Sequence, residues 1–356
     1  MSTEIEYTNP FDQLEDNEKN LNKYKDAGLV ATKVMNKLVK LAKPNKKLID
    51  LINQGNKEII DELNNVQKDV ENKGISFPIC LSVNHIAGHY QPNLNETLKD
   101  GDLLKMELGV QIDGFPAQIA FTTLVTNSKD KFNDKRSNVL KAAIDASREI
   151  SKIMKPGIKN TEIVKIMEQC AGKYNCSLPI SNEAGTLPGV LSFQMSRYVI
   201  DGHNDDDDEF IHRFILSKEN PIYDFGLMEL ELEENEVYAI DIVMCSGQGK
   251  LTKSYDTCVF KRNHKREELK LKASRMALNT FKTKNIGNYP ITINNQDSSI
   301  KLGLKECLNK GMIEAYPIVS EKTGEYIARI KFTIIVKDKP ILICGKQADG
   351  ELCKLE

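Results

Sequence analysis

The sequence has no tryptophan, only five histidines among 356 residues and no long uninterrupted run of apolar residues. Apolar stretches such as residues 332–336 fall far short of the roughly 20 residues that a membrane-spanning helix needs. Residues 1–6 are polar and acidic, and so lack the basic and apolar regions of a secretory signal. We therefore expect a soluble chain that is not exported and has no membrane partner.

The cysteines and the net charge exclude two further classes of protein. Eight cysteines are scattered without a CxxC pair or a histidine at metal-ligand spacing, which argues against a zinc finger. We expect them to be reduced and mostly buried. The net charge is -2 and the pI about 6.3, so the surface as a whole lacks the basic field of a nucleic-acid coat protein. Any RNA contact must be a local patch.

The chain is long enough for one or two domains with a full core, since 40% of its residues are hydrophobic. Polar residues 1–20 carry little to bury and predict a flexible arm. Apolar residues then recur every three or four positions, a spacing typical of amphipathic helices. The predicted helices cover residues 27–41, 48–63, 137–154, 161–174 and 298–308.

Alternating apolar residues predict three strand pairs. The first, residues 104–110 and 117–125, flanks the turn sequence Asp113-Gly114. The second joins residues 237–244 to 253–260, and the third joins 326–336 to 341–344. In the first two pairs an acid lies in the middle of the leading strand, Glu107 and Asp241 respectively. Helices followed by strands, twice over, predict an α+β domain with a pseudo-twofold axis.

Two charged segments stand out. Residues 205–209 are all acidic, which is typical of a solvated loop. Residues 261–284 contain nine Lys or Arg against two acids, Glu267 and Glu268. The charge pattern alone fits a solvated helix face with i to i+4 ion pairs, but it also fits a phosphate-binding patch. Seven of these nine basic residues lie between positions 261 and 275.

Several motifs in order along the chain resemble the type II methionine aminopeptidases. They are Phe77-Pro78, Ser82-Val83-Asn84, His89-Tyr90-Gln91-Pro92-Asn93, Gly101-Asp102-Leu103-Leu104-Lys105, Glu236-Val237-Tyr238-Ala239-Ile240 and Ala328-Arg329-Ile330-Lys331-Phe332-Thr333. The sequence is more similar still to the proliferation-associated 2G4 proteins, also called ErbB-receptor-binding proteins. The motifs that carry this second resemblance are Val199-Ile200-Asp201-Gly202, Ser246-Gly247-Gln248-Gly249-Lys250 and Lys331-Phe332-Thr333.

The resemblance implies a "pita-bread" fold at residues 21–263 and 321–356, with a small helical, winged-helix-like subdomain inserted at residues 264–320. In the active peptidases two Asp, one His and two Glu hold two divalent ions that activate water. Glu107 matches the first Asp and Gln118 the second, Ser192 falls at the histidine, Asp241 replaces a Glu, and Lys331 stands at the last Glu.

His89 resembles the histidine that contacts substrate in the peptidases. A histidine before Tyr-x-Pro also fits a structural hydrogen-bonding residue, and we favour this interpretation because the metal ligands are missing. A leftover peptide-binding groove is the alternative.

Charge argues against metal binding and catalysis. An ammonium at about 4 Å from a divalent ion costs roughly 8 kcal/mol at an effective dielectric near 20. We therefore expect no metal and no other cofactor, and we predict that Lys331 pairs with Glu107 and Asp241 in the former metal pocket.

The resemblance implies a non-enzymatic protein that binds ribosomal RNA of the large subunit near the polypeptide exit, through the RNA backbone rather than the bases. The candidate RNA-binding residues that it implies are Lys261, Arg262, Lys265, Arg266, Lys270, Lys272 and Arg275. It would act in ribosome biogenesis or translation regulation, with regulatory protein partners, as a monomer off the ribosome. The expected location is the cytoplasm, with the nucleus or nucleolus as a second site. The alternatives are a metallo-aminopeptidase or prolidase with unusual ligands, and an adaptor that binds only proteins.

Overall fold

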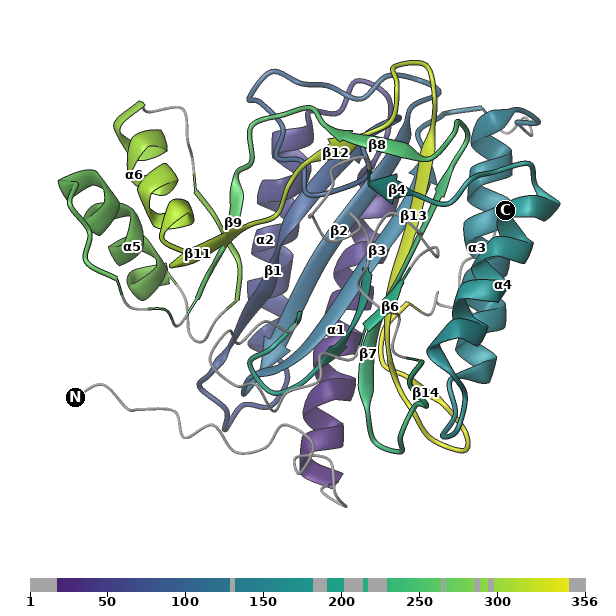
Figure 1. Ribbon diagram of the computed structural model, residues 1–356, viewed down its shortest axis with the longest axis horizontal. Helices are drawn as coiled ribbons and strands as arrows, with labels where there is room; N and C mark the ends of the chain where they lie inside the picture. The colour runs from purple at the N-terminus through teal and green to yellow at the C-terminus, as the bar shows by residue number, and fades with distance from the viewer. Residues whose placement is uncertain are drawn as a thin grey trace.

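An eight-stranded sheet forms the centre of the protein, as the computed structural model shows (Figure 1). The structure describes residues 18–128, 132–181, 191–201, 214–216, 229–263, 265, 267–284, 289–293 and 298–345. The strand order is β1-β2-β3-β13-β7-β5-β6, and β14 pairs with β13. Their bounds are β1 Lys73–Val83, β2 Leu103–Ile112, β3 Phe115–Leu124, β5 Leu191–Met195, β6 Phe214–Leu216, β7 Val237–Cys245, β13 Ile327–Ile335 and β14 Ile341–Leu342.

Two helix pairs cover the sheet. Helices α1 (Glu18–Leu41) and α2 (Leu48–Leu63) pack on β1 to β3, and α3 (Lys135–Ile153) and α4 (Asn160–Lys173) lie beside β7 and β13. The predicted helices are confirmed, although α1 begins inside the segment expected to be an arm. Of that arm, residues 1–17 lie outside the described part of the chain.

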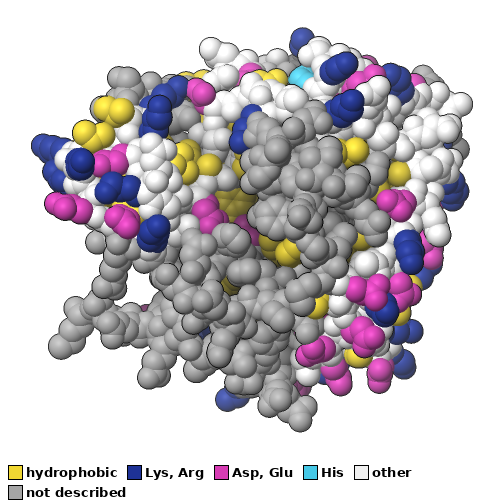
Figure 2. All heavy atoms as spheres, viewed as in Figure 1, with side chains coloured by type: hydrophobic (Ala, Val, Ile, Leu, Met, Phe, Trp, Pro, Cys, Tyr) yellow, Lys and Arg dark blue, Asp and Glu magenta, His cyan; other side chains and the backbone are white. Residues whose placement is uncertain are grey.

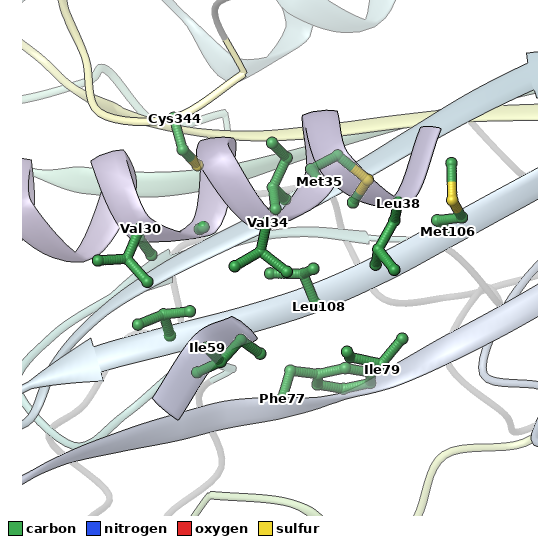
Figure 3. Close-up of a cluster of buried hydrophobic side chains, with 14 of the residues drawn as sticks. Val30, Val34, Met35, Leu38, Ile59, Phe77, Ile79, Met106, Leu108 and Cys344 are labelled. Carbon is green, nitrogen blue, oxygen red and sulfur yellow. The ribbon is translucent and has the colours of Figure 1, made fainter. Parts of the chain in front are cut away.

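The apolar stripe of α1 explains its packing. Val30, Val34 and Leu38 are buried in the same apolar core as Phe77 of β1 and Leu108 of β2 (Figure 3). Burial of each such side chain stabilises the fold by about 1.5–3 kcal/mol. Among the described residues, no helix is both long enough and apolar enough to cross a bilayer.

The first predicted hairpin is confirmed. Strands β2 and β3 pair without a break from Leu103↔Leu124 to Ile112↔Phe115. Between them Asp113 has φ +53° and Gly114 has φ +82°. A two-residue turn with positive φ at both positions matches the twist of the strands, which is why Asp-Gly predicts it. The third predicted pair, β13 with β14, is also present.

The second predicted pair is wrong. Strand β7 is paired on one edge with β13 and on the other with β5, so neither edge is free for residues 253–260. Those residues contribute instead to two small sheets. Strand β8 (Lys250–Lys253) pairs with β4 (Ile180–Ser181) and β12 (Val319–Ser320). Strand β9 (Val259–Arg262) pairs with β10 (Ile291–Thr292) and β11 (Ile313–Ala315).

The two halves of the main sheet meet between β3 and β13. These strands share one paired position, Lys331↔Ala120. On one side of it the Thr122 hydroxyl donates to Arg329 O at 2.7 Å and accepts from Arg329 N at 2.8 Å. On the other side the Thr333 hydroxyl accepts from Gln118 N at 2.8 Å and donates to Gln118 O at 3.0 Å. Two threonine hydroxyls thus satisfy the peptide groups where the strands diverge.

A separate lobe, at the left of Figure 1, corresponds to the predicted insert. It comprises β9, α5 (Lys272–Lys284), β10 (Ile291–Thr292), α6 (Ser298–Asn309) and β11 (Ile313–Ala315), and we call it the insert lobe. Its buried core includes Phe260, Phe281, Leu304 and Ile313. Because β9 is the middle strand of the lobe's sheet, the lobe starts before residue 264, the start expected from the sequence. The acidic run at 205–209 lies outside the described residues.

Replacing Thr333 with Val should destabilise the protein, because it leaves the buried N–H of Gln118 without its partner, whereas the C=O of Gln118 keeps a contact from Cys344 Sγ at 2.9 Å. Each unsatisfied group costs about 1–3 kcal/mol. Thr123→Val is the matched control, since Thr123 lies on β3 but is only half-buried. Urea unfolding should show a clearly lower free energy for Thr333→Val alone. Equal stabilities of the two variants would contradict this account of the junction.

Candidate functional site

Four charged side chains lie together in the middle of the sheet. Glu107 comes from β2, Asp241 from β7, and Arg329 and Lys331 from β13. The register explains the gathering: Lys331 is paired with Asp241 on one side and with Ala120 on the other, and Ala120 is paired with Glu107. Residues two apart on a strand share a face, so Arg329 lies on the same side as Lys331. We call these four residues the charge cluster.

Arg329 is the main cation of the charge cluster. Its Nε and Nη2 donate to the two oxygens of Asp241 at 2.8 and 2.6 Å. Its Nη1 and Nη2 donate to the two oxygens of Glu107 at 2.9 and 2.9 Å. Bidentate, charge-assisted pairs of this kind are the strongest hydrogen bonds that side chains make. Arg329 is 4% exposed, so the pairs are almost fully shielded from water.

Lys331 completes the charge cluster. Its ammonium lies 2.6 Å from Glu107 Oε1 and 3.0 Å from Asp241 Oδ2, and 5.6 Å from the centre of the Phe77 ring. The predicted pairing of Lys331 with both acids is therefore confirmed. Sequence reasoning missed Arg329, although its spacing of two residues from Lys331 on a predicted strand was a usable signal.

The cations keep both acids ionised. Burial by itself would raise the pKa of Glu107, but Arg329 and Lys331 outweigh it and lower this pKa from 4.5 to about 2. Burial is likewise outweighed at Asp241, mainly by Arg329, and the pKa of Asp241 lies well below its usual value. Two carboxylates and two cations leave the charge cluster with no net formal charge.

His89 closes one side of the charge cluster. Its backbone has φ +61°, its Nδ1 lies 3.1 Å from Pro317 O, and its Nε2 lies 3.7 Å from Glu107 Oε2. Burial, together with Arg329 and Lys331, lowers the pKa of His89 to about 4, so the ring is neutral at neutral pH. These contacts support a structural role for His89.

The loop that carries His89 lies directly over the guanidinium group. A Cβ atom at Gly88 would be 1.9 Å from Arg329 Nη1, so no larger residue fits there while the arginine keeps its place. The backbone at Gly88 thus covers this side of the charge cluster.

Gln118 and Ser192 lie next to the charge cluster and are both buried. Gln118, two residues from Ala120 on β3, donates from Nε2 to Ser76 Oγ at 3.1 Å. The Ser192 hydroxyl accepts from the backbone N–H of Asp241 at 2.8 Å. All five residues that the sequence assigned to the former metal site therefore lie on neighbouring strands of the main sheet.

The basic stretch divides into buried and exposed residues. Lys265, Lys270, Lys272 and Arg275 are exposed on the insert lobe, where Lys and Arg side chains gather among a few acids (Figure 2). Arg262 is half-buried, and Arg266 lies outside the described residues.

The structure contradicts the prediction that Lys261 binds RNA. Only 6% of Lys261 is exposed, and its ammonium lies 2.7 Å from Asp201 Oδ1 and 3.2 Å from Glu314 Oε2. It cannot reach a phosphate from this position. Charge pattern alone could not show this, because β9 turns this side chain toward the main domain.

The fold and the position of the charge cluster define a protein of the pita-bread peptidase class. The sequence profile of metallopeptidase family M24 matches residues 22–250. A solved structure described as a thermophilic Arx1 has the same fold, with a TM-score of 0.78 at 23% identity over 93% of this chain and 92% of that one.

Similar sequences place the chain more narrowly within this class. ErbB-3 binding protein 1 of Arabidopsis thaliana is 32% identical over 88% of this chain and 77% of its own length. A protein of Schizosaccharomyces pombe named Curved DNA-binding protein is 32% identical over 94% of this chain and 85% of its own length. The chain belongs to the ErbB-3-binding, or proliferation-associated, family of M24 proteins, as its motifs indicated.

The metal pair of the M24 peptidases does not fit this charge cluster. Two divalent ions require several anionic or neutral oxygen and nitrogen ligands. Here the two available carboxylates already have their oxygens bonded to a guanidinium and an ammonium. Within the described residues, no three His, Cys, Asp or Glu side chains lie close enough to hold a metal ion.

Replacing Arg329 with Met should lower the free energy of unfolding by about 3–5 kcal/mol, because two buried carboxylates then share one lysine. Lys135→Met is the control, since the pair of Lys135 with Glu325 is exposed and should contribute about 1 kcal/mol or less. Chemical denaturation of both variants measures the difference. A loss at Arg329 no larger than at Lys135 would show that the cluster does not stabilise the fold.

Acid should weaken the fold through the charge cluster. Because the pKa of Glu107 is lowered from 4.5 to about 2, its stabilisation is present above pH 4.5 and is lost as the pH falls toward 2. Unfolding of the native protein and of Glu107→Gln can be compared at about pH 6 and about pH 3. The native protein should lose more stability over this interval. If both lose the same amount, other groups account for the acid sensitivity.

Proposed function

We propose that this protein is a non-enzymatic binding protein of the large ribosomal subunit, which contacts ribosomal RNA near the polypeptide exit and acts in ribosome biogenesis or translation regulation. The observation that carries the proposal is the charge cluster, in which Arg329 and Lys331 pair with the two carboxylates. We infer that these two side chains take the place of the metal pair. On this interpretation the protein keeps the fold of the peptidases but lacks the metal ions that their peptide hydrolysis requires.

The exposed basic residues of the insert lobe are the proposed RNA contact. Lys265, Lys270 and Lys272 surround the start of α5, and Arg275 follows one turn later. The start of α5 is fixed by Glu306 of α6, which accepts from Lys270 N at 2.8 Å and Leu271 N at 3.0 Å. Because these N–H groups are already bonded to Glu306, phosphate contacts would come from the exposed Lys and Arg side chains.

The chemistry of these residues favours recognition of the RNA backbone. Lysine and arginine neutralise phosphates and release counterions, and each contact adds roughly one unit to the salt dependence of binding. The names of two relatives, an ErbB-3 binding protein and a DNA-binding protein, are consistent with protein and nucleic-acid partners. The competing functions are a metallopeptidase with unusual ligands and an adaptor for proteins only.

Reversing the charges at Lys265, Lys272 and Arg275 to Glu should abolish most ribosome binding, because three phosphate contacts become repulsive. The matched control reverses Lys152, Lys155 and Lys165, which are exposed on and between α3 and α4. Co-sedimentation with purified large subunits at increasing salt measures both. The native protein should dissociate steeply with salt. Equal binding by the two triple variants would favour the protein-only adaptor.

The purified protein should neither cleave a peptide with N-terminal methionine nor retain divalent metal. Equilibrium dialysis against Co²⁺ or Mn²⁺, followed by metal analysis, should give well under one ion per chain at concentrations that load active enzymes. A type II methionine aminopeptidase serves as the positive control. Two bound ions per chain with peptide hydrolysis would establish the metallopeptidase alternative instead.

A further inference from the structure

The insert lobe meets the main domain at a buried ion pair. Lys261 lies on β9, the central strand of the lobe's sheet, and Glu314 lies on the neighbouring β11 at the paired position. Between the two domains, Lys261 Nζ donates to Asp201 Oδ1 at 2.7 Å and lies 3.3 Å from Asp201 O. Asp201 belongs to the segment that follows β5 in the main domain.

Tyr316 provides a second contact at the same place. It directly follows β11, and its hydroxyl donates to Asp201 Oδ2 at 2.5 Å. Its ring packs edge-on against Phe77 and His89, with centroid distances of 5.3 and 5.4 Å. Both oxygens of Asp201 are therefore bonded to residues of the lobe or its exit segment.

Asp201 and Lys261 stay charged and paired at neutral pH. Burial alone would raise the pKa of Asp201, but Lys261 and the Tyr316 hydroxyl outweigh it and hold this pKa below its ordinary value. Burial of Lys261 is likewise outweighed by Asp201 and Glu314, which raise its pKa. A buried ion pair contributes little net stability but does fix geometry, because breaking it leaves an uncompensated charge.

We propose that Lys261, Asp201, Glu314 and Tyr316 form an anchor that holds the insert lobe in one orientation on the main domain. Since β9 and β11 are adjacent strands of one small sheet, fixing both to Asp201 fixes the whole lobe. The anchor also adjoins the charge cluster: His89, which contacts Tyr316, lies 3.7 Å from Glu107. This inference does not depend on RNA binding, because it concerns the free protein.

Amide hydrogen exchange of the full chain tests the anchor. Tyr316→Phe keeps the ring packing and removes only the hydroxyl. The combined variant Asp201→Asn, Lys261→Met and Glu314→Gln removes all three charges without leaving one unpaired. The control is Lys301→Met, which breaks an exposed ion pair between α6 and Asp256, in the segment before β9.

Both anchor variants should increase exchange about ten-fold or more in residues 196–201 and 313–317, the segments that join lobe and main domain. Residues 277–281 and 304–308, inside the lobe, should exchange as in the native protein, because the lobe has its own core. Unchanged exchange at the joining segments would overturn the proposal. An equal increase throughout the lobe would also overturn it, since the residues would then support folding in general.

Discussion

The rest of the structure depends on the pairing of Arg329 and Lys331 with Glu107 and Asp241. Three strands, β2, β13 and β7, contribute to it at the centre of the sheet, where water cannot screen an unpaired charge. A pita-bread fold with carboxylates at this point requires a positive partner. The peptidases of the family meet this requirement with metal ions. In this chain the positive partners of the two carboxylates are the side chains of Arg329 and Lys331.

Strand β13 combines this electrostatic role with a topological one. It is paired with β7 at nine positions and with β3 at one, flanked by the hydroxyls of Thr122 and Thr333. The strand that joins the two halves of the sheet is thus also the strand that carries both cations. Replacing Arg329 would disturb both the charge cluster and the junction with β3. Its side chain pairs with the two carboxylates, and its backbone bonds to the Thr122 hydroxyl.

How far the sequence could predict this protein depends on the range of each interaction. The bounds of α2 and the turn at Asp113-Gly114 follow from periodicity and turn chemistry within a few residues. The pairing of β7 with β13 spans about 80 residues of sequence and could not be read from either strand. Arg329 was missed because only the positions that match the five metal ligands of the peptidases were considered. A guanidinium group at another position can still fill the space between those residues. Lys261 was misplaced because a charge pattern does not reveal which side of a strand is buried.

The charge cluster and the proposed anchor are neighbours, because His89 contacts both. Without Arg329 and Lys331, the carboxylates of Glu107 and Asp241 would repel each other beside His89, whose ring packs against Tyr316 of the proposed anchor. Arg329 and Lys331 remove that repulsion while keeping the carboxylates where His89 can pack against them. If the proposed anchor holds the insert lobe, the exposed cations at the start of α5 have a fixed position relative to the main domain, as the proposed recognition of a phosphate backbone requires.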